Sequence, residues 1–345
     1  MSLKPFSPFP AAASSDAAVA PTSTSATPPS ELLVADIGGS HIRIARHLGG
    51  SHCELLQQTA TPAQDWSAFC EALHAAVAPH AGPHSALSIA IAGVVSPVSG
   101  EVQAANLPAL RGHALARELT ARLGLPVQAH NDADCAALAE ARVGVGAGHE
   151  VVFGAVLGTG VGGGLVVRGQ LVRGAGGLCG EWGHGPILRE TTLWNGHGQP
   201  VQLPRWACGC GQIGCLDTVG GARGLERLHL ALNAGAPRNS HQLLIDWQAG
   251  EPAASATVAA WIELLSGPLA LVLNVTGASV VPVCGGLSRC TTLIAALDAA
   301  VRQQILRRDA EDLPLLRPSV LNDQAGLIGA ALAFEHEALH PELRP

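Results

Sequence analysis

Lysine is almost absent from this sequence: Lys4 is the only one, and all other basic residues are arginines. A phosphate-binding loop built around a lysine is therefore excluded at the glycine-rich turns described below. Basic residues are also in the minority, because 20 of them stand against 27 acidic ones and the net charge is −7. This balance argues against a nucleic-acid-binding protein, which usually carries a basic face.

Cysteines are few for 345 residues, and the nine present are odd in number and mostly scattered. Such usage argues against a secreted fold held together by disulfides. Only Cys208, Cys210 and Cys215 lie close together, and this cluster needs an explanation of its own.

Charged residues are scarce as well, at 14% against 48% hydrophobic, so a sizeable core is possible and wholesale disorder is excluded. The length fits about two domains. Residues 1–30 differ from the rest because they are rich in Ala, Ser, Thr and Pro and contain no apolar block long enough for a signal peptide. They predict a disordered tail.

One uncharged stretch, residues 264–288, is long enough to suggest a membrane span. Asn274, Pro282 and a pair of glycines interrupt it, so we expect a buried helix that ends near Asn274 and then a strand at 278–284. The sequence therefore predicts a soluble cytoplasmic protein with no membrane partner.

The apolar pattern divides the chain into two α/β halves that open alike, each with a strand, a glycine turn and a second strand. Strands are predicted at 32–37, 42–45, 87–95, 127–129, 151–157 and 278–284 with a hairpin at 165–172, and helices at 65–78, 113–123, 134–142, 221–233, 256–275, 291–307 and 325–337. This repetition predicts two related lobes around a cleft. We place the N-terminal lobe at 31–145 and the C-terminal lobe at 146–345.

The glycine turn in each half of the chain has a composition typical of a phosphate-binding turn. Gly38, Gly39 and Ser40 follow the first strand, and residues 158–164 hold five glycines in seven positions. Glycines let backbone N–H groups approach a phosphate closely, and Asp36 at the strand end could hold a hydrated Mg²⁺. A plain hairpin would explain either turn alone, but their equivalent places favour one nucleotide held from both lobes.

Two carboxylates, Asp132 and Asp134, lie two residues apart at a predicted junction of strand and helix. A base at this position could accept the proton of an attacking hydroxyl during phosphoryl transfer. An ordinary helix cap would use the same residue types. Spacing alone does not show which of the two carboxylates would act as the base.

The cysteine cluster places three thiols within eight residues, with glycines between them. Such a segment suits a tight metal knuckle, and three cysteines with one histidine form a recognised structural zinc set. His184, His197 and Asp217 are candidates for the fourth ligand. Three unrelated buried cysteines fit the glycine spacing less well, so we predict zinc.

Five segments together carry a family resemblance, and they are DIGGS (36–40), HNDADC (130–135), GTGVGGG (158–164), GEWGH (180–184) and CGCGQIGC (208–215). In this order and spacing the chain resembles the ROK family of sugar kinases and repressors, from about Leu32 to Ala333. The resemblance implies an α/β fold of two actin-like ATPase, RNase H-like lobes around a central cleft, with a zinc-knuckle insertion. It also allows the last helix to pack back on the N-terminal lobe.

The resemblance further implies roles for individual residues. Asp132 would be the catalytic base that deprotonates the sugar 6-hydroxyl. The sugar-binding residues would be Asn106, Asn131, Asp132, Glu181 and His184, with Asp217 in place of the family's usual Glu and one methylene shorter. ATP and its Mg²⁺ would be bound by Asp36, Gly38, Gly39, Ser40, Thr159, Gly160, Gly285 and Gly286. The zinc ligands would be His184, Cys208, Cys210 and Cys215.

Within the family, the segment GEVQAANLP (100–108) and the 23-residue loop between His184 and Cys208 are similar to N-acetylglucosamine kinases. The expected activity is ATP-dependent phosphorylation of the 6-hydroxyl of N-acetylglucosamine by a homodimer. Glucokinase and N-acetylmannosamine or other hexose kinases remain alternatives. From another class, a non-catalytic sugar sensor or repressor remains, although the residues before Leu32 do not predict the helix-turn-helix that repressors carry.

Overall fold

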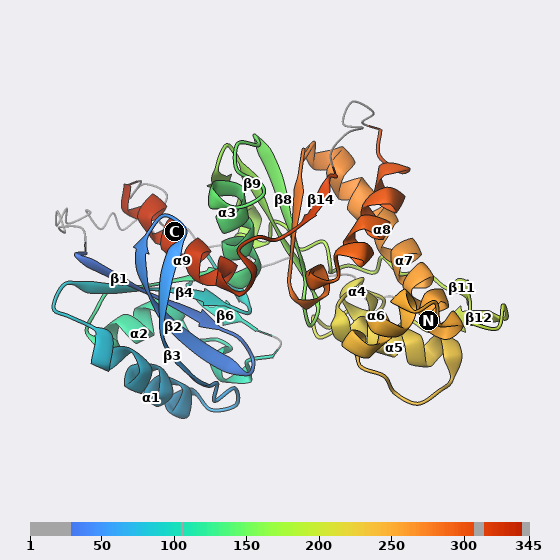
Figure 1. Cartoon of the computed structure of the whole chain (residues 1–345). Helices are drawn as coiled ribbons and strands as arrows, with labels where there is room; N and C mark the ends of the chain where they lie inside the picture. The colour runs from blue at the N-terminus through green and yellow to red at the C-terminus, as the bar shows by residue number, and fades with distance from the viewer. Residues whose placement is uncertain (1–28, 105, 307–313, 340–345) are drawn as a thin grey trace, which may run out of the picture.

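The structure is a computed structural model that describes residues 29–104, 106–306 and 314–339. Two lobes lie side by side, each built on a five-stranded sheet (Figure 1). Ser30 leads into the first strand and donates its N–H to the carbonyl of His84, 3.1 Å away. Most of the predicted tail, residues 1–28, lies outside the described residues.

The first sheet has the strand order β3-β2-β1-β4-β7. Its first two pairs are antiparallel, whereas β4 and β7 run parallel to β1. The strands are β1 (Glu31–Ile37), β2 (His41–Gly49), β3 (His52–Ala60), β4 (Ser85–Ile91) and β7 (Val127–Asn131), with a small hairpin of β5 (Val94–Val95) and β6 (Val102–Gln103) beside them. Every residue of β4 is buried, as expected of a strand covered on both faces.

The second sheet repeats this topology strand for strand, in the order β10-β9-β8-β13-β14 and with the same sequence of antiparallel and parallel pairs. Its strands are β8 (Val151–Leu157), β9 (Val161–Val167), β10 (Gln170–Leu171), β13 (Val281–Cys284) and β14 (Leu316–Pro318). In each sheet a glycine turn joins the same two strands. The prediction of two related α/β lobes is confirmed.

Helices cover the sheets, and each lobe has its own apolar core. The first lobe has α1 (Trp66–Val77) and α2 (Leu115–Leu123), and the second has α4 (Asp217–Gly220), α5 (Ala222–Asn233), α6 (Ser240–Gln248), α7 (Pro252–Thr276) and α8 (Thr291–Arg302). Short 3₁₀ turns lie at 78–80, 108–110, 175–177, 286–289 and 322–324. By length and composition α7 could cross a membrane. Here Trp261, Leu265 and Leu269 place it in the core of the second lobe.

The final helix of each half packs on the opposite sheet. Helix α3 (Asp132–Val143) follows β7 but packs on β8 and β9, whereas α9 (Ala325–Leu339) packs on β1 and β4 (Figure 1). Ser88 on β4 donates its hydroxyl to the carbonyl of Ala330, 2.7 Å away. The two helices also touch each other, because a Cβ on Gly329 would lie 1.9 Å from the carbonyl oxygen of Cys135. The pair α3 and α9 therefore joins the two sheets.

Some predicted boundaries are wrong. The strand expected at 87–95 ends at Ile91, because the chain turns at Gly93, where a Cβ would lie 2.9 Å from the carbonyl of Gln103. The helix expected at 291–307 ends at Arg302. The hairpin strand expected from residue 165 begins four residues earlier as β9, since its glycines let α3 approach: a Cβ on Gly164 would lie 2.8 Å from Cβ of Ala137.

The long loop between His184 and Cys208 forms a hairpin of β11 (Thr191–Trp194) and β12 (Pro200–Leu203). Its Leu193 and Leu203 are buried in the core of the second lobe. At its tip Gly196 donates its N–H to Asn233 on α5, 3.0 Å away. The loop, whose structure the sequence did not predict, is therefore anchored on the second lobe.

Candidate active site and metal centre

Asp132 is the first residue of α3, directly after the end of β7. Asn131 caps this helix: its side-chain oxygen accepts the N–H of Asp134 at 2.9 Å, and its amide donates to the carbonyl of Gly93 at 3.0 Å. Both ends of the Asn131 amide are thus held by the backbone. The cap fixes the first turn of α3 and with it the direction of the Asp132 carboxylate.

The surroundings of Asp132 favour its protonated form. Burial raises the pKa of Asp132 to about 7, and the negative charges of Asp36 and Glu181 act in the same direction. These two carboxylates come from the end of β1 and from the loop before the metal cluster. Asp132 therefore lies in the field of acidic groups from both lobes, with a pKa suited to general-base catalysis near neutral pH.

Asp134 has a different environment. Its side chain is buried, and within the described part of the chain its Oδ1 has no hydrogen-bond partner. Burial raises the pKa of Asp134 to about 8, Glu181 adds to the rise, and Arg173 opposes it. The spacing of Asp132 and Asp134 could not show which of them would act as the base, but their surroundings in the structure differ.

The first glycine turn, Gly38–Ser40, is held from the side by Thr61, whose hydroxyl donates to the carbonyl of Gly38 at 2.8 Å. Thr61 also donates its N–H to the carbonyl of Ser40 at 3.0 Å. Asn106 lies against the turn, since a Cβ on Gly39 would be 3.6 Å from Cβ of Asn106. The structure thus brings a predicted sugar ligand next to a predicted phosphate turn.

Asp36 is opposite Arg43 in the register of β1 and β2, and the Arg43 guanidinium donates to its carboxylate. Burial raises the pKa of Asp36, while Arg43 lowers it. The positive charge of Arg43 is therefore paired with this carboxylate.

The second glycine turn lies between β8 and β9 and contains Thr159 and Gly160. Gly285 packs directly on it, because a Cβ there would lie 2.6 Å from the N atom of Gly158. Gly286 follows Gly285 and faces open space: apart from its own chain neighbours, no atom of the described structure lies within 4 Å of a Cβ on it. The structure therefore brings the Gly285–Gly286 segment next to the turn that contains Thr159 and Gly160.

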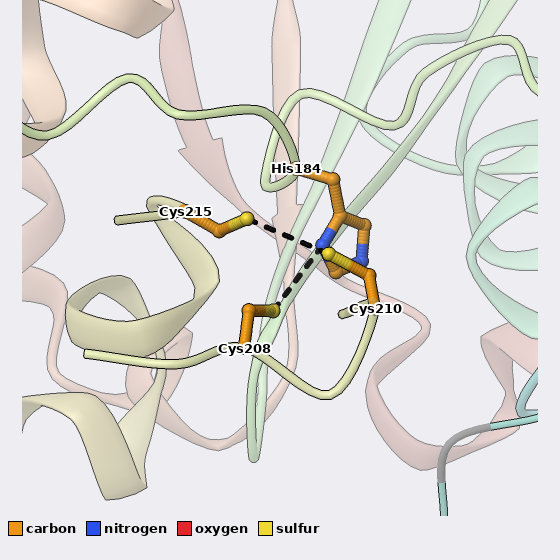
Figure 2. A group of neighbouring side chains, drawn as sticks. All are labelled: His184, Cys208, Cys210 and Cys215. Carbon is orange, nitrogen blue, oxygen red and sulfur yellow. Dashed lines mark hydrogen bonds between the residues drawn. The ribbon is translucent and has the colours of Figure 1, made fainter. Parts of the chain in front are cut away.

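Four side chains converge as a candidate metal centre in the second lobe: His184, Cys208, Cys210 and Cys215 (Figure 2). Their donor atoms all lie within 4.8 Å of one another. The His184 Nδ1 and Cys208 Sγ atoms are 3.6 Å apart, and the Sγ atoms of Cys210 and Cys215 are 3.5 Å apart. These two separations match the edges of roughly 3.5–3.8 Å of a tetrahedron with Zn–S near 2.3 Å and Zn–N near 2.0 Å, and the other donor pairs lie within 4.8 Å. The donor set therefore fits zinc.

His184 connects this cluster with Glu181. Its Nδ1 faces Cys208, while its Nε2 lies 3.7 Å from a carboxylate oxygen of Glu181. Burial raises the pKa of Glu181, His184 lowers it, and Asp217 raises it. One imidazole thus links the candidate metal centre to a predicted sugar ligand, as outer-shell partners of metal sites commonly do.

Asp217 lies between the metal cluster and the second glycine turn. One oxygen accepts the N–H of Val161 at 2.7 Å, and the other accepts the Cys208 thiol at 3.7 Å. The sequence suggested this residue as a sugar or metal ligand but gave no sign of its contact with the turn.

Two further residues near the site carried no recognisable signal in the sequence. Thr61 follows β3, an edge strand too polar to be noticed, and Arg173 follows the short β10 and pairs with Glu337 of α9. Both act through contacts across strands or lobes. Only the three-dimensional arrangement shows them.

The sequence model of the ROK family matches residues 33–337 of the chain. The N-acetylgalactosamine kinase AgaK of Shewanella sp. (strain ANA-3) is 32% identical over 300 residues, which cover 86% of this chain and 94% of the relative. The N-acetyl-D-glucosamine kinase of Escherichia fergusonii is 31% identical over 299 residues, covering 86% and 96%.

Among solved structures, the ROK family glucokinase of Streptomyces griseus in complex with glucose and AMPPNP superimposes with a TM-score of 0.71 at 26% identity. The match covers 87% of this chain and 98% of that one. The actin-like ATPase fold expected from the resemblance is confirmed.

Proposed function

This chain belongs to the ROK family, and we propose that it is a sugar kinase that transfers the γ-phosphoryl group of ATP to the 6-hydroxyl of N-acetylglucosamine. Relatives at 31–32% identity are named as kinases of N-acetylated hexosamines, which supports the substrate class. The AMPPNP complex of the Streptomyces griseus glucokinase supports ATP as the donor.

The observation that carries the proposal is Asp132 in the first turn of α3, where burial and the carboxylates of Asp36 and Glu181 raise its pKa. In the proposed reaction, Asp132 removes the proton as the sugar O6 attacks the γ-phosphorus. The O6–P bond forms, the bond between the γ-phosphorus and the bridging oxygen breaks, and ADP leaves. A base with a pKa near 7 accepts this proton efficiently at neutral pH.

The remaining residues would position the two substrates. We assign the sugar hydroxyls to Asn106, Asn131, Glu181, His184 and Asp217, in addition to Asp132. We assign the ATP phosphates to Gly38, Gly39, Ser40, Thr159 and Gly160, whose backbone N–H groups suit anions, and the adenosine to Gly285 and Gly286. Closure of the lobes on the sugar would exclude water from the reacting groups.

Two metals complete the proposal. Mg²⁺ would be held by Asp36 and would neutralise charge on the phosphates; its presence would also relieve the repulsion between Asp36 and Asp132. Zinc would be held by His184, Cys208, Cys210 and Cys215, and would fix the loop that carries Glu181. We also propose a cytoplasmic homodimer.

Asp132→Asn tests the assignment of the base. Phosphorylation should fall by about 10²–10⁴-fold, while the affinity for N-acetylglucosamine measured by calorimetry changes little. Asp65→Asn is the matched control, because the Asp65 side chain caps α1 by accepting the N–H of Ala68, and Asn caps helices equally well. Near-normal turnover of Asp132→Asn would exclude this residue as the base.

Kinetic measurements with a panel of sugars test which sugar is the preferred substrate. We expect kcat/KM to be highest for N-acetylglucosamine when it is compared with N-acetylgalactosamine, N-acetylmannosamine and glucose. A preference for glucose would make the protein a glucokinase. No ADP release with any sugar would favour the sensor or repressor class.

Elemental analysis tests the zinc. About one zinc per chain is expected, and a strong chelator should lower the melting temperature. A metal-free protein that is fully folded and active would remove zinc from the proposal.

A further inference from the structure

The segment that follows the last cysteine of the candidate metal centre lies against the second glycine turn. Asp217 begins α4 two residues after Cys215. Its Oδ1 accepts the N–H of Val161 at 2.7 Å, and Val161 directly follows Gly160 of the turn. Its Oδ2 accepts the thiol of Cys208 at 3.7 Å. A single carboxylate thus contacts both a metal-ligand candidate and the turn.

The fit between this segment and the turn is close at three more positions. A Cβ on Gly160 would lie 2.2 Å from the Oδ1 of Asp217, and a Cβ on Gly221 would lie 2.5 Å from the Cα of Gly160. Ala222 donates its N–H to the carbonyl of Gly158 at 2.8 Å. Residues 217–222 therefore follow the turn from Gly158 to Val161, and no side chain could be inserted between them.

The segment before His184 approaches the same place. Asp217 donates its own N–H to the carbonyl of Gly183 at 2.8 Å. A Cβ on Gly183 would lie 2.5 Å from the carbonyl oxygen of Val161. The two chain segments that bring His184 and Cys215 to the metal centre thus both contact the start of β9.

We propose that the metal centre sets the geometry of the second phosphate turn through Asp217, so that metal occupancy controls nucleotide affinity. A turn with five glycines has high conformational freedom, and ordering it on binding would weaken the affinity for a nucleotide. Metal binding fixes His184 and Cys215, and the hydrogen bond from the Asp217 N–H to the Gly183 carbonyl joins the backbone beside these two ligands. This backbone positions the Asp217 carboxylate that holds the N–H of Val161. Asp217 is a positioning residue in this role, which rests on the proposed nucleotide site.

The test measures binding of Mg–AMPPNP by calorimetry, without sugar, so that any contact of Asp217 with sugar does not contribute. In zinc-loaded protein, Asp217→Ala should weaken AMPPNP binding by about 10-fold, as expected for loss of a charged hydrogen bond to the backbone. Its zinc content should remain about one per chain. Asp217→Asn keeps an acceptor for Val161 and should bind nearly as the wild type does. Asp246→Ala removes a carboxylate on α6 that pairs with Arg238, and it is the control. It should change neither the affinity for AMPPNP nor the zinc content.

Removal of the metal is the second part of the test. Removal of zinc from folded wild type, checked by circular dichroism, should weaken AMPPNP binding to a similar extent, and added zinc should restore it. In Asp217→Ala the same depletion should have little further effect, because the connection is already broken.

The outcomes separate the two proposals. If zinc-loaded wild type does not bind AMPPNP, the proposed function fails. If it binds AMPPNP but the affinity survives both metal depletion and Asp217→Ala, or if only sugar affinity changes, the coupling is overturned. Should Asp217→Ala not fold, the depletion arm in wild type and in Asp217→Asn decides the question alone.

Discussion

Asp132 and Asp134 differ in their surroundings although they are of one residue type and lie in one helical turn. The Asp132 carboxylate accepts the N–H of Ala133 at 2.9 Å. Asp134 is 8% exposed, and its Oδ1 lacks a partner among the described residues. An ionised Asp134 would be a buried charge that Glu181 repels, and the attraction of Arg173 does not outweigh these two effects, so the fold favours its neutral form.

The pH dependence of the reaction follows from Asp132. It accepts a proton only when ionised, and burial raises its pKa to about 7, so kcat/KM should fall as the pH decreases below about 7. The decline should approach about tenfold per pH unit. Initial rates between pH 5 and 8.5 at saturating ATP measure it. A flat profile across this range would show that the rate does not depend on a group with this pKa.

Stability should depend on pH through Asp134. Its pKa is about 8 in the folded state and 3.8 as the ordinary value, so between these values the folded state holds a proton that the unfolded state lacks. Folding stability therefore falls as the pH rises through this window. Asp134→Asn cannot titrate at this position, so it does not lose this stability as the pH rises. The melting temperature of the variant minus that of the wild type should therefore increase by about 3 °C or more between pH 5 and pH 8. An equal difference at both pH values would contradict a neutral Asp134.

At the scale of elements, the crossing of α3 and α9 depends on one glycine. Gly329→Ala would place a methyl group 1.9 Å from the carbonyl oxygen of Cys135, so the helices must separate. We expect a loss of about 1–3 kcal/mol in unfolding free energy, measured by denaturant titration.

Gly267→Ala on α7 is the matched control for this substitution. Its added methyl group would meet only the flexible Gln304 side chain at 3.4 Å. This change should be neutral or stabilising by up to about 1 kcal/mol, because alanine favours helix more than glycine does. Equal effects of the two substitutions would show that the contact with Cys135 is unimportant.

The sequence predicts elements whose signal is local. The strands that precede the two glycine turns and the hairpin around Arg168 and Gly169 are found where expected, since an apolar run and a turn residue identify each. Strand β3 was missed because it is a polar sheet edge. The hairpin of β11 and β12 was missed because its strands are four residues long and depend on contacts with α5 and α7.

In the candidate site too, features with a local sequence signal could be predicted, whereas contacts between distant segments could not. Residues within motifs, such as Asp132 and the cysteine cluster, could be selected from the sequence because their types and spacing suit a known chemistry. The double contact of Asp217 could not be predicted, since it joins segments 56 residues apart. Its shorter side chain in place of the family's Glu was the only hint in the sequence.

At the scale of the whole molecule, two cores are joined by exchanged helices. Each lobe has its own cluster of buried apolar residues, which alone would allow the lobes to unfold separately. Helix α3 also lies on the second sheet and α9 on the first, so neither lobe is complete without the other half of the chain.

Calorimetric unfolding should therefore show one cooperative transition for the wild type. Gly329→Ala, which disturbs the crossing, should broaden or split it. Two resolved transitions in the wild type would show that the exchanged helices do not couple the lobes.

The position of α9 has a consequence for biosynthesis. Helix α9 begins at Ala325, whereas the strands it covers, β1 and β4, lie within the first hundred residues. Domains usually fold in order as they leave the ribosome. The first lobe of this chain cannot follow that rule, because the face of its sheet that α9 covers stays open until residues 325–339 have been synthesised.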